Sequence, residues 1–116
     1  MEILVFILNE VEKLDELLLE LSQKGLKGAT ILTSAGMAKS IYDSNNPNKS
    51  DNIVINSLKI LLNNNNEENK TIFTIVNEKQ KKIFQNVVNN VVGPLSEKNT
   101  GIMFTIPVNS VDGIIE

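Results

Sequence analysis

Residues 71–88 read TIFTIVNEKQKKIFQNVV, and the fold class can be predicted by starting from this segment. All six residues of 71–76 are β-branched or aromatic, which predicts a strand. Asn77 with Gln80 three positions later is typical of a capping box, so a helix should begin at once. The stretch therefore predicts a strand that runs directly into a helix. The apolar face of this helix recurs at helical spacing and comprises Ile83, Phe84, Val87, Val88 and Val91.

The start of the chain has the same order of a strand followed by a helix. Residues 3–8 (ILVFIL) form a continuous apolar run, which predicts a buried strand. Asn9 with Glu12 repeats the capping pattern, and Gly25 can end a helix in the left-handed conformation. At the end of the second helix, Gly-Pro at 93–94 has the same effect. The apolar stripe of the first helix comprises Leu14, Leu17, Leu18 and Leu21.

A further strand follows each helix. Residues 29–33 (ATILT) form one, and residues 102–107 (IMFTIP) form the other, whose terminal proline predicts an edge or the end of pairing. Two strand-helix-strand halves predict an α+β, ferredoxin-like βαββαβ fold with a four-stranded antiparallel sheet and both helices on one face. The opposite face should stay apolar and uncovered. A chain this small usually hides such a face against other subunits, so we expect a homo-oligomer.

A long insert separates the two halves of the single domain 1–116. It spans about residues 35–69 and is rich in Asn, Ser, Lys and Asp, as solvated loops are. Within it, INSLKILL predicts a short helix at 57–62. Leu58, Leu61 and Leu62 could dock this helix on a partner, or the helix could fold back over its own protein.

Composition excludes several kinds of chemistry. The 116 residues contain no Cys, His, Trp or Arg, so thiol chemistry, imidazole bases, zinc sites and guanidinium clamps are not expected. We therefore expect a protein that is not an enzyme and has no metal site. A net charge of −3 and 4% aromatic residues argue against nucleic-acid binding. The apolar start is too short to span a membrane, and we expect a cytoplasmic protein.

Two segments carry a resemblance to a known family. KGATILTSAGM (27–37) and GIMFTIPVNSVDGI (101–114) resemble blocks of the PII signal-transduction family, and more closely its divergent PII-like relatives. GPLSEKNTG (93–101) is placed like the family's B-loop, and the insert like its mobile T-loop. The resemblance implies a homotrimer that binds small effectors, commonly adenine nucleotides, in clefts between subunits. It also implies that the T-loop contacts a target, often a transporter or an enzyme.

The resemblance also implies positions for the ligand site. Thr30 matches a strand threonine near the adenine, and Gly36 matches the first glycine at the T-loop root. Met37 stands where the family often has Phe, Lys39 where it has a basic residue, and Gly101 at the last B-loop glycine. The implied ligand-binding residues are Thr30, Gly36, Met37, Lys39, Lys98 and Gly101.

The chain also departs from the family's pattern. Ile102 replaces a phosphate-contacting lysine, the C-terminal arginines have no counterpart, and Tyr42 lies too near the root to match the uridylylated tyrosine. We therefore expect a less charged or different ligand, and no nitrogen control. The alternative is a CutA-like trimeric scaffold or metal-tolerance protein on the same fold. An acylphosphatase-like enzyme is the weakest reading, because its phosphate cradle needs arginine.

Overall fold

The computed structural model describes residues 1–37, 68–97 and 100–113. The elements are β1 (Glu2–Leu8), a 3-10 turn η1 (Val11–Lys13), α1 (Leu14–Gln23), β2 (Thr30–Ser34), β3 (Asn69–Val76), α4 (Glu78–Val91) and β4 (Gly101–Pro107). The strands form one sheet in the order β2-β3-β1-β4, and all neighbours are antiparallel. The predicted ferredoxin-like fold is confirmed. The predicted helix at 57–62 lies outside the described residues.

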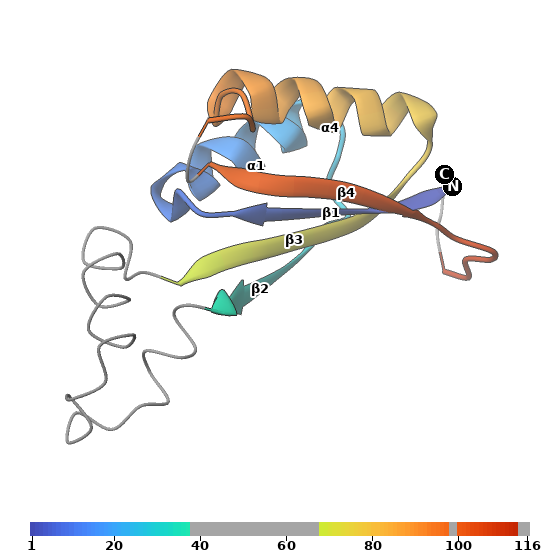
Figure 1. Cartoon of the computed structure of the whole chain (residues 1–116). Helices are drawn as coiled ribbons and strands as arrows, with labels where there is room; N and C mark the ends of the chain where they lie inside the picture. Colours follow the sequence, from blue (N-terminus) through green and yellow to red (C-terminus); the bar gives the residue numbers. More distant parts are fainter. Residues whose placement is uncertain (38–67, 98–99, 114–116) are drawn as a thin grey trace, which may run out of the picture.

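Both helices cover the same face of the sheet (Figure 1). Every second residue of β1 points toward them, so Leu4, Phe6 and Leu8 are fully buried. The Phe6 and Phe84 rings meet edge to face, with centroids 6.3 Å apart and planes at 79°. The core therefore lies between the sheet and the helix layer. Besides Leu4, Phe6, Leu8 and Phe84, the buried apolar side chains are Leu17, Leu21, Ile72, Val76, Val87, Val88, Val91 and Val92.

The helix α4 begins and ends as predicted. The Asn77 side chain accepts a hydrogen bond from the Gln80 backbone N–H at 2.8 Å, and the Gln80 side chain accepts one from the Asn77 N–H at 2.9 Å. This reciprocal pair is the predicted capping box. After the helix, Gly93 has a φ of +102°, and its N–H donates to the Val88 carbonyl. A left-handed glycine therefore ends the helix.

The capping prediction at Asn9 is wrong. The Asn9 N–H donates to the carbonyl oxygen of Thr100 at 3.2 Å, so this donor is already used by a tertiary contact. The chain then passes through η1, and Lys13, which precedes α1, makes no side-chain cap. The end of α1 is as predicted: Gly25 has a φ of +90°, and the Leu26 N–H donates to the Leu21 carbonyl. This is the Schellman arrangement.

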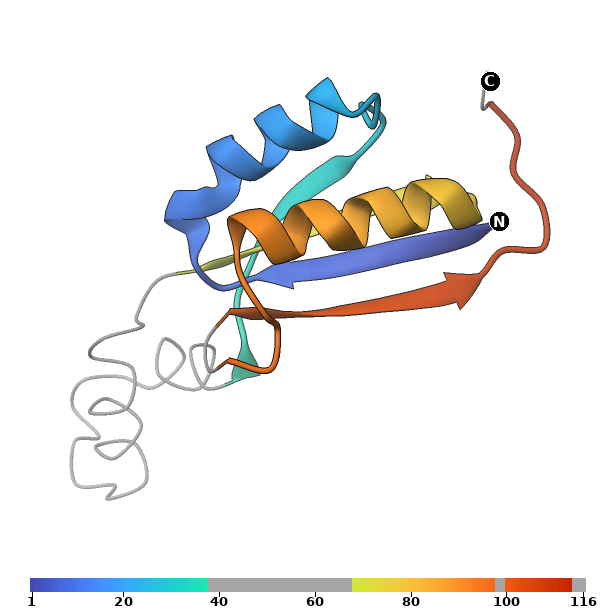
Figure 2. The ribbon, with the colours of Figure 1, turned by 90° about the horizontal axis from the view of Figure 1, so that it is seen from above.

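The two edges of the sheet are β2 and β4. Seen from above, β4 lies to one side of α4 and is not covered by it (Figure 2). Pro107 is the last residue of β4, as its lack of an N–H predicts for an edge strand.

Candidate functional site

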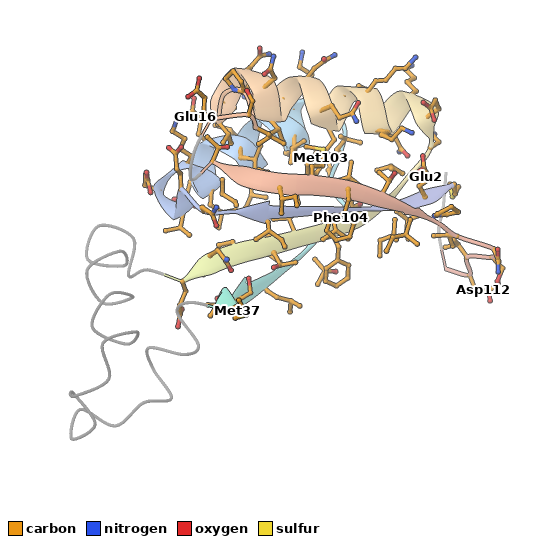
Figure 3. All side chains as sticks on the ribbon, viewed as in Figure 1. Glu2, Glu16, Met37, Met103, Phe104 and Asp112 are labelled. Atoms are coloured by element: carbon orange, nitrogen blue, oxygen red, sulfur yellow. The ribbon has the colours of Figure 1, made fainter. Side chains whose placement is uncertain are left out.

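The sheet face opposite the helices is made of apolar side chains. Directly paired residues of antiparallel strands lie on one face, and Val5 pairs with both Phe73 and Phe104. Since Val5 alternates with the buried residues of β1, this row points away from the helices. Phe104 is the member of the row that is labelled in Figure 3. We call this surface the open face. Its apolar members are Ile3, Val5, Ile7, Leu32, Phe73, Ile75, Ile102, Phe104 and Ile106.

The open face is accessible in the single chain. Ile102 is 57% exposed, Leu32 is 52% exposed and Ile106 is 49% exposed. These side chains belong to one contiguous surface that crosses all four strands, unlike scattered surface leucines. Contiguous apolar surfaces of this kind mark contacts with another molecule. The prediction of an apolar and uncovered face is confirmed for the part of the chain that the structure describes.

The insert leaves and re-enters the sheet at a polar corner of the open face. Ser34 ends β2 and pairs with Asn69, the first residue of β3. The Ser34 hydroxyl hydrogen-bonds to the Asn69 side-chain oxygen, and it lies 2.7 Å from the Thr71 hydroxyl. On the helix side, the Lys70 ammonium donates to the Thr33 hydroxyl at 2.8 Å. Side chains therefore join the two ends of the insert, which the sequence analysis did not predict.

Three of the implied ligand residues lie on or just beyond the edge strand β2. Thr30 is the first residue of β2, pairs with Phe73 and is exposed on the open face. Gly36 and Met37 follow the strand, and Met37 is 81% exposed. Gly36 has no left-handed φ, and a Cβ at this position would meet no atom within 4 Å. Its backbone therefore does not require glycine.

Gly101 lies on the opposite edge strand. It begins β4 and pairs with Leu8, at the same end of the sheet as Ser34. Two strands separate β4 from β2, so their axes are about 14 Å apart at a spacing of about 4.8 Å per strand. One chain therefore does not bring Gly101 together with Gly36 and Met37.

Five of the predicted site residues lie outside the described residues, namely Lys39, Lys98, Leu58, Leu61 and Leu62.

The opposite end of the sheet carries an ion triad. The Lys81 ammonium lies 2.7 Å from a Glu2 carboxylate oxygen and 3.1 Å from a Glu78 oxygen. The hydrogen bond from Lys81, with a second from the Thr105 hydroxyl, lowers the pKa of Glu2. The hydrogen bonds to Glu2 and then Glu78 raise the pKa of Lys81. The triad fastens the start of α4 to β1, a role for Lys81 that the sequence pattern did not indicate.

The described residues were also compared with the requirements of a membrane span and of a metal site. No described helix is both long enough and apolar enough to cross a membrane. Within 1–37, 68–97 and 100–113, no three acidic side chains form a group that could hold a metal ion.

Comparison of the sequence with protein-family models and with curated proteins found no match.

Proposed function

We propose that this chain is a non-enzymatic, PII-like regulatory subunit that assembles as a homotrimer through its open face. The observation that carries the proposal is the continuous apolar surface across all four strands, in which Phe104 on the edge strand β4 is 42% exposed. Burying such a surface in an assembly releases about 25 cal/mol for each Å² removed from water. Packing the open faces around a common axis would give each subunit two identical neighbours.

The positions of the implied ligand residues suit a site between subunits. Gly36 and Met37 lie beyond one sheet edge and Gly101 on the other, at the same end of the sheet. In a ring, the contact between neighbours joins two different surfaces of the same chain. The β2 edge of one subunit can then approach the β4 edge of the next. We propose that a small effector, such as an adenine nucleotide, binds at this seam.

The polar corner suggests how such a site would signal. Ser34 and Asn69 hold the two ends of the insert against the sheet, so a ligand beside Met37 lies next to the residue where the insert departs. A ligand that contacts only one arrangement of the insert would shift its population by the difference in binding free energy. A target, for example a transporter or an enzyme, could then respond to the effector through the insert.

The test is calorimetry of the full chain with adenine nucleotides, cyclic dinucleotides and bicarbonate. We expect one of these to bind, and Thr30→Val to weaken its binding roughly fivefold, because one hydrogen bond is worth about 1 kcal/mol. Thr33→Val is the matched control on the other face of β2. A trimer that binds none of them would support the CutA-like scaffold instead, and a monomer would overturn both.

A further inference from the structure

The outer edge of β4 presents free backbone groups in a regular row. At its two ends, the β1–β4 ladder is extended by hydrogen bonds from the Asn9 N–H to the Thr100 carbonyl and from the Val108 N–H to the Met1 carbonyl. Both pairs continue the register of the two strands. Hydrogen-bonded pairs alternate with non-bonded pairs in an antiparallel ladder. The backbones of Ile102, Phe104 and Ile106 therefore face β1.

The alternate residues of β4 face outward. The N–H and C=O groups of Met103 and Thr105 point away from β1, on the side where residues 1–37, 68–97 and 100–113 supply no further strand. Pro107 belongs to the same outward set and has no N–H to leave unpaired, which explains its place. None of the residues of β4 carries a charge, although natural edge strands are usually protected by charged side chains. This edge is suited to accept another strand.

A cleft of about 530 Å³ opens beside these free groups, on the helix side of β4. Its volume falls within the roughly 300–1,000 Å³ that is typical of ligand pockets. Leu95 and Met103 provide apolar surface, and the side chains of Gln85, Asn86 and Asn89 provide amides from α4. Val88, Gly93, Phe104 and Thr105 also line the cleft, and none of the lining residues that the structure describes is charged.

We propose that the cleft between α4 and β4 binds an extended peptide segment of another protein, which adds to β4 as a fifth strand. The backbone of the peptide would bond to the outward groups of Met103 and Thr105. Every second side chain of an added strand points toward the helix layer, so one such side chain would enter the cleft. Because the lining is uncharged and partly apolar, an apolar side chain fits there better than a charged one.

A second copy of this chain fits the cleft less well than a free peptide. In a symmetric pairing of two β4 strands, the side chains on the helix side would be those of the copy's own Met103 and Thr105. Met103 already packs against its own core, so it is not free to fill a neighbour's cleft. Pro107 would also lack the N–H for its part of the ladder. The proposal requires the outward groups of Met103 and Thr105 to stay open in the proposed trimer, so a neighbouring subunit that paired with this part of β4 would exclude it.

The experiment selects random nine-residue peptides displayed on phage against the full chain, and then titrates a synthetic peptide of the enriched sequence. We expect apolar residues at alternate positions. Asn89→Lys should weaken binding about tenfold, because it places a charge at the uncharged cleft. Asn90→Lys is the matched control, since Asn90 is an exposed residue of the same helix and does not line the cleft.

Amide hydrogen exchange of the same protein supplies the second readout. Without peptide, the Met103 and Thr105 amides should exchange quickly and those of Phe104 and Ile106 slowly; the peptide should slow the first two. Three results would overturn the proposal: no enriched peptide, equal loss of binding in both variants, or slow Met103 and Thr105 amides in the protein alone. In the last case a second copy covers the edge, and the trimer proposal stands.

Discussion

A side chain at Gly101 would overlap the carbonyl oxygen of Ile7 on the neighbouring strand, and its Cβ would come within 2.9 Å of a Phe6 ring carbon. Gly101 also has a φ of +153°, which residues with a side chain rarely adopt. Gly101→Ala should therefore lower the free energy of unfolding by about 2 kcal/mol or more. Urea denaturation followed by circular dichroism measures this loss.

Gly28→Ala is the control for that substitution. Gly28 has no left-handed φ, and a Cβ there would meet no atom within 4 Å. Its stability should stay close to that of the unaltered protein. If the two variants are equally stable, the close approach of Gly101 to Ile7 does not exist in solution.

The capping box of α4 gives a second prediction. Asn77→Ala removes the side chain that accepts the Gln80 N–H, and it should cost about 1 kcal/mol of stability. Asn9→Ala makes the same change where the structure shows no side-chain cap, and we expect a clearly smaller effect. Thermal and urea unfolding of both variants test the pair. Equal losses would mean that Asn9 caps a helix after all.

These two asparagines show how far local sequence patterns could predict the structure. Both were predicted to precede a helix, and each has a Glu or Gln three positions later that could complete a capping box. At Asn77 the backbone N–H donates to the Gln80 side chain, and the local pattern forms. At Asn9 the N–H is taken by Thr100, a residue far away in the sequence. The apolar periodicities correctly predicted the four strands and the helices α1 and α4, because burial between the sheet and the helix layer reinforces them.

The candidate sites depend on relationships that a linear pattern does not contain. Lys81 and Glu2 are 79 positions apart and meet only because β1 and β3 pair in one register. The cleft beside β4 follows from which strand forms the edge and from which of its backbone groups face outward. Pro107 was the only local signal of that edge. The amides of Gln85, Asn86 and Asn89 look like ordinary solvated helix residues in the sequence.

The ion triad makes stability depend on pH. The pKa of Glu2 is lowered in the folded state, so its contribution is present above the ordinary carboxyl pKa and is lost as the pH falls through the folded value. Glu2→Gln should therefore be less stable than the unaltered protein at pH 7, and the difference should shrink in acid. Urea unfolding across this pH range measures it.

Glu16→Gln, on an exposed position of α1, is the matched control and should show little difference at either pH. The ion pairing would be contradicted if the difference in unfolding free energy between Glu2→Gln and the unaltered protein stayed constant as the pH falls. The pKa of Lys81 is raised in the folded state, so the pH dependence has the opposite sign. The stability that Lys81 contributes is full below the ordinary lysine pKa and is lost as the pH rises through the folded-state pKa.

Assembly through the open face can be tested with two similarly exposed apolar residues. Ile102 is 57% exposed on the open face, and Leu19 is 60% exposed on α1. Light scattering should give three chain masses for the unaltered protein. Ile102→Lys should dissociate it, since a buried lysine without a partner is costly, and Leu19→Lys should leave it intact. A stable monomer of the unaltered protein, or dissociation by both variants, would contradict the assembly.

The hydrogen bond between Ser34 and Asn69 has a practical consequence for engineering. Strands β2 and β3 are already joined by hydrogen bonds at the point where the chain leaves and re-enters the sheet. The pairing of the two strands therefore does not require a particular length of the segment between them. Closing a longer loop costs little additional entropy, since the cost grows only with the logarithm of its length. Foreign epitopes or small reporter domains could be spliced in here without unfolding their carrier.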